Sequence, residues 1–301
     1  MGAGHSHDHS HGGPQRDFGA AFGWGVVLNL AFVVVEATYG FISGSMALVA
    51  DAGHNLSDVL SLALAWGASV LAKRPPAGRF TYGFKSSTIL AALANAALLL
   101  VAIGGIAFET IGRLGEPPAV EGRTMIIVAG IGIVINAGTA MLFARGRKHD
   151  INIRGAFLHM AADALVSLGV VVAGAAILWT GERWIDPAAS LLIVLVIAWG
   201  TWGLLKDSVK LALHAVPDHI DEQGVRAHLA SLPGVAAVHD LHIWPMSTTE
   251  AALTAHLVIP GGHPGDTFLR DLGEKLDHDF HIGHATIQVE TGPCGMRHAH
   301  D

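Results

Sequence analysis

The stretch ADAGHNLSDVL, residues 50–60, places two aspartates, a histidine and an asparagine between two strongly apolar segments. SMALV precedes it and SLALAWGASVLA follows it. On a single helix, Asp51, His54, Asn55 and Asp58 fall within an arc of about 100°, because each residue turns the helix by about 100°. His54 and Asp58 are four positions apart, so they stack on adjacent turns of one face. The pattern predicts a polar face on a helix that otherwise suits lipid.

The composition of the whole chain is typical of a membrane protein. Of its 301 residues, 51% are hydrophobic and only 14% are charged, whereas soluble proteins carry about 25% charged residues. Spanning a bilayer takes roughly 20 apolar residues. Runs of this kind predict six transmembrane helices, at about 18–41, 45–72, 86–112, 123–144, 155–180 and 187–212.

Charge and cysteine content exclude several classes of protein. The net charge of −7 gives no support for a nucleic-acid partner, because such partners are recognised by basic surfaces, so none is expected. The single cysteine, Cys294, excludes an intrachain disulfide and a four-cysteine zinc site within one chain. The N-terminal MGAGHSHDHSHGG has histidines where a signal peptide would have a basic and then an apolar region, so no removable signal peptide is expected.

Lysine and arginine gather in two of the predicted loops. These loops follow the second and fourth spans and hold Lys73, Arg74, Arg79 and Lys85, and Arg145, Arg147, Lys148 and Arg154. The positive-inside rule therefore predicts that these loops and both termini are cytoplasmic, in a multi-pass protein of the cell (inner) membrane.

Residues after Pro217 predict a small α+β region. Helical spacing of apolar residues occurs at 225–232 and 268–280, and strand patterns occur at 235–244, 251–259 and 284–290. The order αββαβ predicts a ferredoxin-like or metallochaperone-like layer of helices on a sheet. The expected layout is a disordered histidine-rich tail at 1–16, a transmembrane domain at 17–213, a cytoplasmic domain at 214–292 and a short tail at 293–301.

The fifth predicted span repeats the histidine–aspartate pair of the second, as His159 and Asp163 in HMAAD. An ionisable group at the bilayer centre costs roughly 2.5–3.5 kcal/mol on insertion scales, so these groups need partners. One such pair alone has a structural explanation, a hydrogen bond that locks two helices. Two pairs of the same type and spacing favour a metal or proton site. Two imidazoles and two carboxylates suit the tetrahedral coordination of zinc.

Other polar residues in the spans have weaker assignments. Asp51 and Asn55 either orient the ligands or line a wet vestibule. Isolated groups in spans 1, 3 and 4 are best explained by hydrogen bonds between helices, with a place along the ion path as the alternative; they are Glu36, Asn95, Glu109 and Asn136.

Taken together, HNLSD, HMAAD, six spans and a histidine-bearing C-terminal domain resemble the cation diffusion facilitator family, most closely its bacterial cobalt–zinc–cadmium resistance type. The segments SGSMALVADAGHNLSD, VHDLHIW and TIQVE extend the resemblance over nearly the whole chain. The resemblance implies a homodimeric, proton-coupled exporter of divalent metal, whose transport site matches His54, Asp58, His159 and Asp163. A histidine pair resembles the zinc-preferring members and leaves Cd²⁺, Co²⁺, Ni²⁺ and Fe²⁺ open as further substrates. Some relatives bind another metal in the loop after span 2, but this loop has no histidine, so no such site is expected.

The ligands also suggest a mechanism. Metal binding requires neutral histidine and ionised carboxylate, so protons and metal compete for the site. We therefore expect zinc/proton antiport by alternating access, with zinc as substrate and no catalytic cofactor. HExxH and GxSxG are both missing from the sequence, which argues against an intramembrane metalloprotease or serine hydrolase. A metal-selective channel and a membrane-anchored metal sensor are the alternatives.

Further histidines lie outside the spans. By resemblance to the family, the cytoplasmic domain binds regulatory zinc near its dimer interface, with His239, His256 and Glu290 as the leading ligands and His242 and His284 as additional candidates. The alternative is that these are ordinary histidines of a sheet surface. The tail histidines His5, His7, His9 and His11 suggest weak metal capture or, equally, an inert solvated tail.

Overall fold

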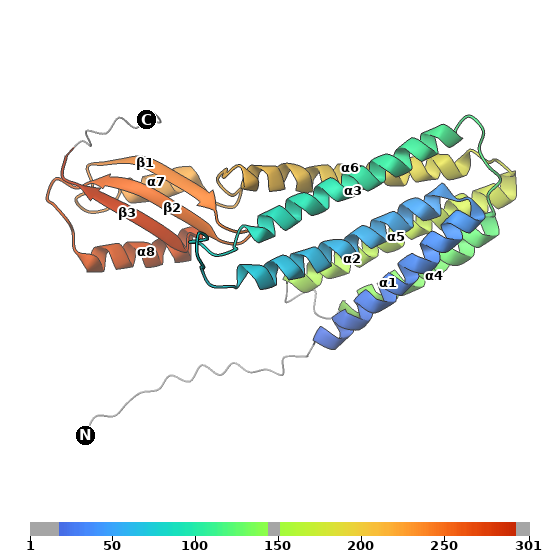
Figure 1. Cartoon of the computed structure of the whole chain (residues 1–301), viewed down its shortest axis with the longest axis horizontal. Coiled ribbons are helices and arrows are strands. Elements are labelled where there is room, and N and C mark those ends of the chain that lie inside the picture. Colours follow the sequence, from blue (N-terminus) through green and yellow to red (C-terminus); the bar gives the residue numbers. More distant parts are fainter. Residues whose placement is uncertain (1–17, 144–150, 293–301) are drawn as a thin grey trace, which may run out of the picture. The chain divides into compact units, whose positions relative to one another are not determined.

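The structure is a computed structural model of the chain, and it describes residues 18–143 and 151–292, with side chains at 27–141 and 157–292. Six long helices come first: α1 (Phe18–Ser43), α2 (Met46–Ala72), α3 (Ser87–Arg113), α4 (Gly122–Phe143), α5 (Ile151–Thr180) and α6 (Ile185–Ala212) (Figure 1). Five of them, α2 to α6, are long and apolar enough to cross a membrane, and α1 contributes the shorter apolar stretch Val27–Ser43. The predicted polytopic helical protein is therefore confirmed, although α5 begins four residues earlier than expected.

The surfaces of these helices carry large apolar side chains. Phe108, Trp179 and Trp199 are 82%, 91% and 87% exposed. In water such exposure would be unfavourable, but in a bilayer the hydrocarbon covers it, while each helix satisfies its own backbone hydrogen bonds. The apolar runs therefore face lipid, and the polar groups between them turn inward.

Contacts divide the chain into two units, residues 1–59 with 106–193 and residues 60–105 with 194–301. In the first unit α4 packs along α5, and α1 packs on α4. Gly122 of α4 makes the closest approach: a Cβ atom there would lie 2.6 Å from the Gly174 carbonyl oxygen of α5. Small residues at such a contact let two membrane helices pack closely.

A buried carboxylate fixes the start of α2. Ser45 is its N-cap and accepts a hydrogen bond from the Leu48 amide at 3.2 Å. Asp186, in the first turn of α6 and 1% exposed, accepts hydrogen bonds from the Ser45 hydroxyl, from the Met46 amide at 2.8 Å and from the Ala47 amide at 3.3 Å. One side chain of α6 therefore satisfies the otherwise unpaired first amides of the helix that carries His54 and Asp58.

The C-terminal region lies in the second unit and has the predicted order: α7 (Glu222–Ala230), β1 (Ala237–Pro245), β2 (Ala251–Val258), α8 (Asp266–Phe280) and β3 (His284–Glu290). The sheet has the order β1-β2-β3, in which β1 pairs with β2 antiparallel and β2 pairs with β3 parallel. α7 and α8 pack against this sheet (Figure 1). The predicted α+β layer is confirmed.

Buried apolar side chains alternate with other side chains along β2, so the two faces of the sheet differ in character. Leu253, Ala255 and Leu257 are fully buried in a core that also contains Leu229 of α7 and Leu276 of α8. Successive side chains of a strand point to opposite faces. His256 therefore lies on the face opposite the two helices, where polar groups gather.

Candidate metal-transport site

Helices α2 and α5 bring the four predicted ligands together within the first unit. His54 Nε2 lies 3.3 Å from Asp163 Oδ1, and His159 Nε2 lies 3.4 Å from Asp58 Oδ2. The pairs within each helix are slightly wider, at 3.8 Å for His54–Asp58 and 3.7 Å for His159–Asp163. Each histidine therefore approaches the aspartate of the other helix more closely than its own.

Three of these four side chains are already close enough to share one ion. One donor atom each from His54, Asp58 and Asp163 lies within 4.8 Å of the other two. His159 is more open, at 44% exposed, and its ring centroid lies 6.4 Å from that of His54. A small movement of His159 would complete a set of two nitrogens and two oxygens, which suits a tetrahedral divalent cation.

Asp163 is the most deeply placed of the four. It is 1% exposed, and neither carboxylate oxygen accepts a hydrogen bond from the described residues. Its nearest polar neighbours are the ring nitrogens of His54 and His159, at 3.3 Å and 3.7 Å, and a buried carboxylate is unfavourable unless a cation or a proton neutralises it. The site is therefore built to hold positive charge.

A second layer of buried polar groups adjoins the ligands. Ser167 donates a hydrogen bond to Asp51 at 2.9 Å, and the Asn55 amide donates to Glu36 at 3.1 Å. These four side chains are fully buried. Asp51 and Asn55 thus bond to α5 and α1, respectively. Ser167 was missed by the sequence reasoning, although it lies four residues after Asp163 and so on the same face of α5.

The remaining isolated polar groups of the spans have varied surroundings. Glu109 pairs with Arg113 of its own helix at 3.0 Å, and Arg113 also donates to the Gly44 carbonyl at 3.0 Å. Asn95 lines a cavity in the second unit. Asn136 is fully buried, and its amide has no hydrogen-bond partner in the described part of the chain.

A second cluster forms on the open face of the sheet. His239 and His256 are opposite one another in the β1–β2 register, with ring centroids 5.0 Å apart. Glu290 approaches His239 Nε2 at 3.1 Å and His256 Nδ1 at 3.0 Å. Burial by itself would raise the pKa of Glu290, but hydrogen bonds from Gln288 and His239 and the charges of the histidines lower it. These three donors lie within 4.8 Å of one another and fit a metal ion.

The other predicted residues of this domain have different neighbours. His242 Nε2 lies 3.0 Å from Asp240, and the second Asp240 oxygen lies 3.4 Å from His256 Nε2. Asp240 was missed by the sequence reasoning. It has a positive φ of 51° at the register shift between His239 and His242, which an alternating strand pattern does not predict. His284 stays out of the cluster. Its ring packs edge-on against Tyr82, with ring centroids 5.6 Å apart, and it lies six positions before Glu290 along β3.

The tail residues that the sequence suggests for metal capture, His5, His7, His9 and His11, lie outside the described residues.

Comparisons with known proteins match both regions of the chain. Residues 24–211 match the cation efflux transmembrane domain, and residues 217–292 match the cytoplasmic domain of cation efflux proteins. The cation efflux system protein CzcD of Alcaligenes sp. (strain CT14) is 39% identical over 98% of this chain and 92% of its own length. The zinc transporter ZitB of Escherichia coli (strain K12) is 36% identical over 96% of this chain and 93% of its own length.

Two further proteins are similar to parts or all of this chain. The cadmium, cobalt and zinc/H(+)-K(+) antiporter of Bacillus subtilis (strain 168) is 33% identical over 98% of this chain and 94% of its own length. A solved structure, the metal-bound C-terminal domain of the CzcD transporter from Cuprividus metallidurans, is 36% identical over 24% of this chain and 99% of that chain, with a TM-score of 0.21. From the two domain matches and the near full-length relatives, the chain belongs to the cation efflux family, whose members are metal-cation transporters and not enzymes.

Proposed function

We propose that this protein exports Zn²⁺ in exchange for protons by alternating access. The observation that carries the proposal is the convergence of His54, Asp58, His159 and Asp163 from two apolar helices, with each histidine within 3.4 Å of the aspartate on the other helix. A ligand set divided between two helices can be opened or closed by a small relative movement of those helices, as alternating access requires.

The donor atoms favour zinc. Two imidazole nitrogens with two carboxylate oxygens suit a borderline cation of tetrahedral preference, whereas an all-oxygen site would favour harder ions such as Mn²⁺. The zinc transporter and the cadmium, cobalt and zinc antiporter among the relatives support this choice.

Proton coupling follows from the same groups. Metal binding needs neutral imidazoles and ionised carboxylates, so loading displaces any proton held at the site. When the site faces the other side of the membrane, incoming protons compete with the ion and promote its release. Proton exchange named for the Bacillus relative supports this step.

The membrane topology and assembly complete the proposal. The basic connections after α2 and α4 lie on the cytoplasmic side of the cell membrane, together with both termini. Residues 214–292 form the cytoplasmic domain of a homodimer, and His239, His256 and Glu290 hold a regulatory zinc ion there. The convergence of these three donors on one sheet face supports this assignment.

The test uses proteoliposomes that contain a zinc dye and a pH dye, with the interior made acidic. Antiport predicts zinc uptake together with loss of internal protons. Asp163→Asn keeps the side-chain volume but removes the charge, and we expect it to slow zinc-dependent proton flux by about 100-fold or more, because loss of an outer-shell partner alone costs 10–100-fold. Glu109→Gln is the matched control, because Glu109 is also a spanning-helix carboxylate but is 56% exposed and paired with Arg113.

The two dyes separate the alternatives. Zinc uptake without proton movement would identify a channel and refute antiport. Undiminished zinc flux in Asp163→Asn would refute the site itself.

A further inference from the structure

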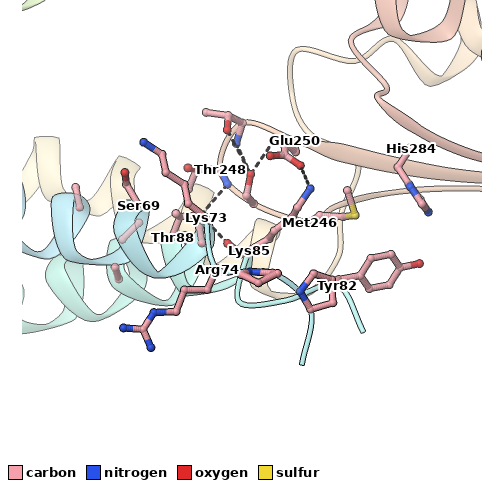
Figure 2. A pocket seen from close by; sticks show the side chains of 18 of the residues that line it. Ser69, Lys73, Arg74, Tyr82, Lys85, Thr88, Met246, Thr248, Glu250 and His284 are labelled. Carbon is pink, nitrogen blue, oxygen red and sulfur yellow. Dashed lines mark hydrogen bonds and ion pairs between the residues drawn. The ribbon is translucent and has the colours of Figure 1, made fainter. Parts of the chain in front are cut away.

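The second unit contains a cavity of about 940 Å³ that the transport site does not use. Its walls come from the second half of α2, the first half of α3, α6, the loop after α2 and the β1–β2 turn (Figure 2). One part of the lining is apolar and lies on the spanning helices: Ala65, Ala72, Ala91, Ala92 and Leu204. The cavity therefore joins a lipid-compatible wall to the polar end of the spans.

The polar part of the lining carries an excess of positive charge. Lys73, Arg74 and Lys85 line the cavity against one carboxylate, Glu250. Lys85 is paired with Glu250. Lys73 and Arg74 form no ion pair with any residue that the structure describes, and both are exposed. In Figure 2 no dashed line joins the Lys73 ammonium or the Arg74 guanidinium to a carboxylate. Within the part of the chain that the structure describes, two positive charges at this cavity are therefore not neutralised.

This charge distribution decides which kind of ligand the cavity can take. A divalent cation would be repelled, because three cationic side chains face one paired carboxylate. An anion would gain charge-assisted hydrogen bonds from Arg74 and Lys73, and a guanidinium suits phosphate in particular. Ser69, Thr81 and Tyr82 are also among the lining residues, and each carries a hydroxyl group that can donate a hydrogen bond.

The depth at which the cavity lies identifies the source of the anion. It is situated where α2 ends at Ala72 and α3 begins at Ser87, which is the level of lipid headgroups, and basic pockets between transmembrane helices bind such headgroups. We propose that the cavity binds an anionic phospholipid, with its phosphate at Lys73 and Arg74 and an acyl chain along the apolar wall.

The β1–β2 turn forms a further wall of the cavity. The Ser86 hydroxyl donates to the Met246 carbonyl at 3.2 Å, and the Thr248 amide donates to Thr88 at 3.1 Å. The turn that forms one wall is thus attached to the start of α3. A bound headgroup would lie between the loop after α2 and this turn.

The experiment measures binding of phosphatidylglycerol and phosphatidylcholine with identical acyl chains to the full-length protein in detergent, by native mass spectrometry. We expect the first phosphatidylglycerol to bind at least tenfold more tightly than phosphatidylcholine. Removing both charges in Lys73→Gln/Arg74→Gln should weaken phosphatidylglycerol about 25-fold, since each basic residue near anionic lipid contributes about fivefold. Binding of phosphatidylcholine should not change.

Three further arms make the test decisive. Arg79→Gln removes one charge from the same loop but outside the cavity lining, so it should change binding less than twofold. Lys73→Arg/Arg74→Lys keeps both charges and should retain the lipid preference. Equal weakening in Arg79→Gln, or no preference in the wild type, would overturn the proposal. Displacement of phosphatidylglycerol from the wild type by millimolar inorganic phosphate would show that the cavity takes the free anion, and would overturn the lipid assignment.

Discussion

Replacing Asp186 by alanine should destabilise the membrane helices substantially, although Asp186 is not a metal ligand. Its carboxylate accepts three hydrogen bonds at the start of α2, and the shortest backbone one, from Met46, is 2.8 Å. Alanine would leave the Ser45 hydroxyl and two backbone amides buried without an acceptor.

The magnitude follows from these contacts. A hydrogen bond to a charged group contributes about 1.5–3 kcal/mol, and the Ala47 bond is long at 3.3 Å, so we count two full bonds. Asp186→Ala should therefore lower the free energy of unfolding by about 3–6 kcal/mol. Asp186→Asn, which keeps an acceptor but loses the charge that favours a helix N-terminus, should cost about 1–3 kcal/mol.

Thermal unfolding of the purified full-length protein in detergent measures the effect. With a shift of about 2–3 °C per kcal/mol for a chain of this size, Asp186→Ala should lower Tm by about 10 °C. Glu182→Gln is the control, because Glu182 is an exposed carboxylate just before the same helix, and it should leave Tm nearly unchanged. A shift for Asp186→Ala no larger than that of Glu182→Gln would refute the buried-cap argument.

Two further predictions concern the C-terminal domain. Asp240→Asn should weaken zinc binding at the sheet cluster 10–100-fold, because Asp240 lies 3.4 Å from His256 Nε2 and orients that ring. Calorimetry measures this binding in the full chain carrying Asp163→Asn, in which the transport site is disabled. An unchanged Kd for zinc would contradict the orienting role of Asp240. Burial, and then the charge of Lys275, lower the pKa of His228, so the unfolded chain binds a proton there more readily. The free energy of unfolding should then fall as pH drops from 7 through 6.5 toward the pKa of His228 in the folded protein. The opening free energy of α7, measured by hydrogen exchange, should depend less on pH in His228→Leu than in the wild type. An equal pH dependence in the two proteins would exclude His228 as the cause.

Much of the fold was predictable from sequence, because it depends on local periodicity. Apolar runs of span length set the number of long helices, and the bounds of α2 and α3 are within one residue of those expected. The spacing of four between His54 and Asp58, repeated in His159 and Asp163, places each pair on one helical face, since that spacing depends only on the helix repeat.

Partner choice between elements was decided by tertiary structure. Asn55 shares the polar face of α2 with His54, yet it donates to Glu36 of α1. His284 and Glu290 share the alternation of β3, but only Glu290 reaches His239 and His256. The periodicity of one helix or strand predicts which face of it a side chain lies on. It does not predict which residues of the neighbouring helix or strand pack against that face.

The sequence by itself therefore determined a membrane protein with six long helices, an αββαβ domain and two histidine–aspartate pairs facing inward. Only the tertiary structure decided that each histidine lies closer to the aspartate of the other helix, that Asp240 joins the histidines of the sheet at a register shift, and that Asp186 of α6 caps α2. The physical reason is the separation along the sequence over which each effect acts. Hydrophobic periodicity depends on a few neighbouring residues of one helix or strand. These contacts join residues up to 141 positions apart and form only when the helices and strands pack.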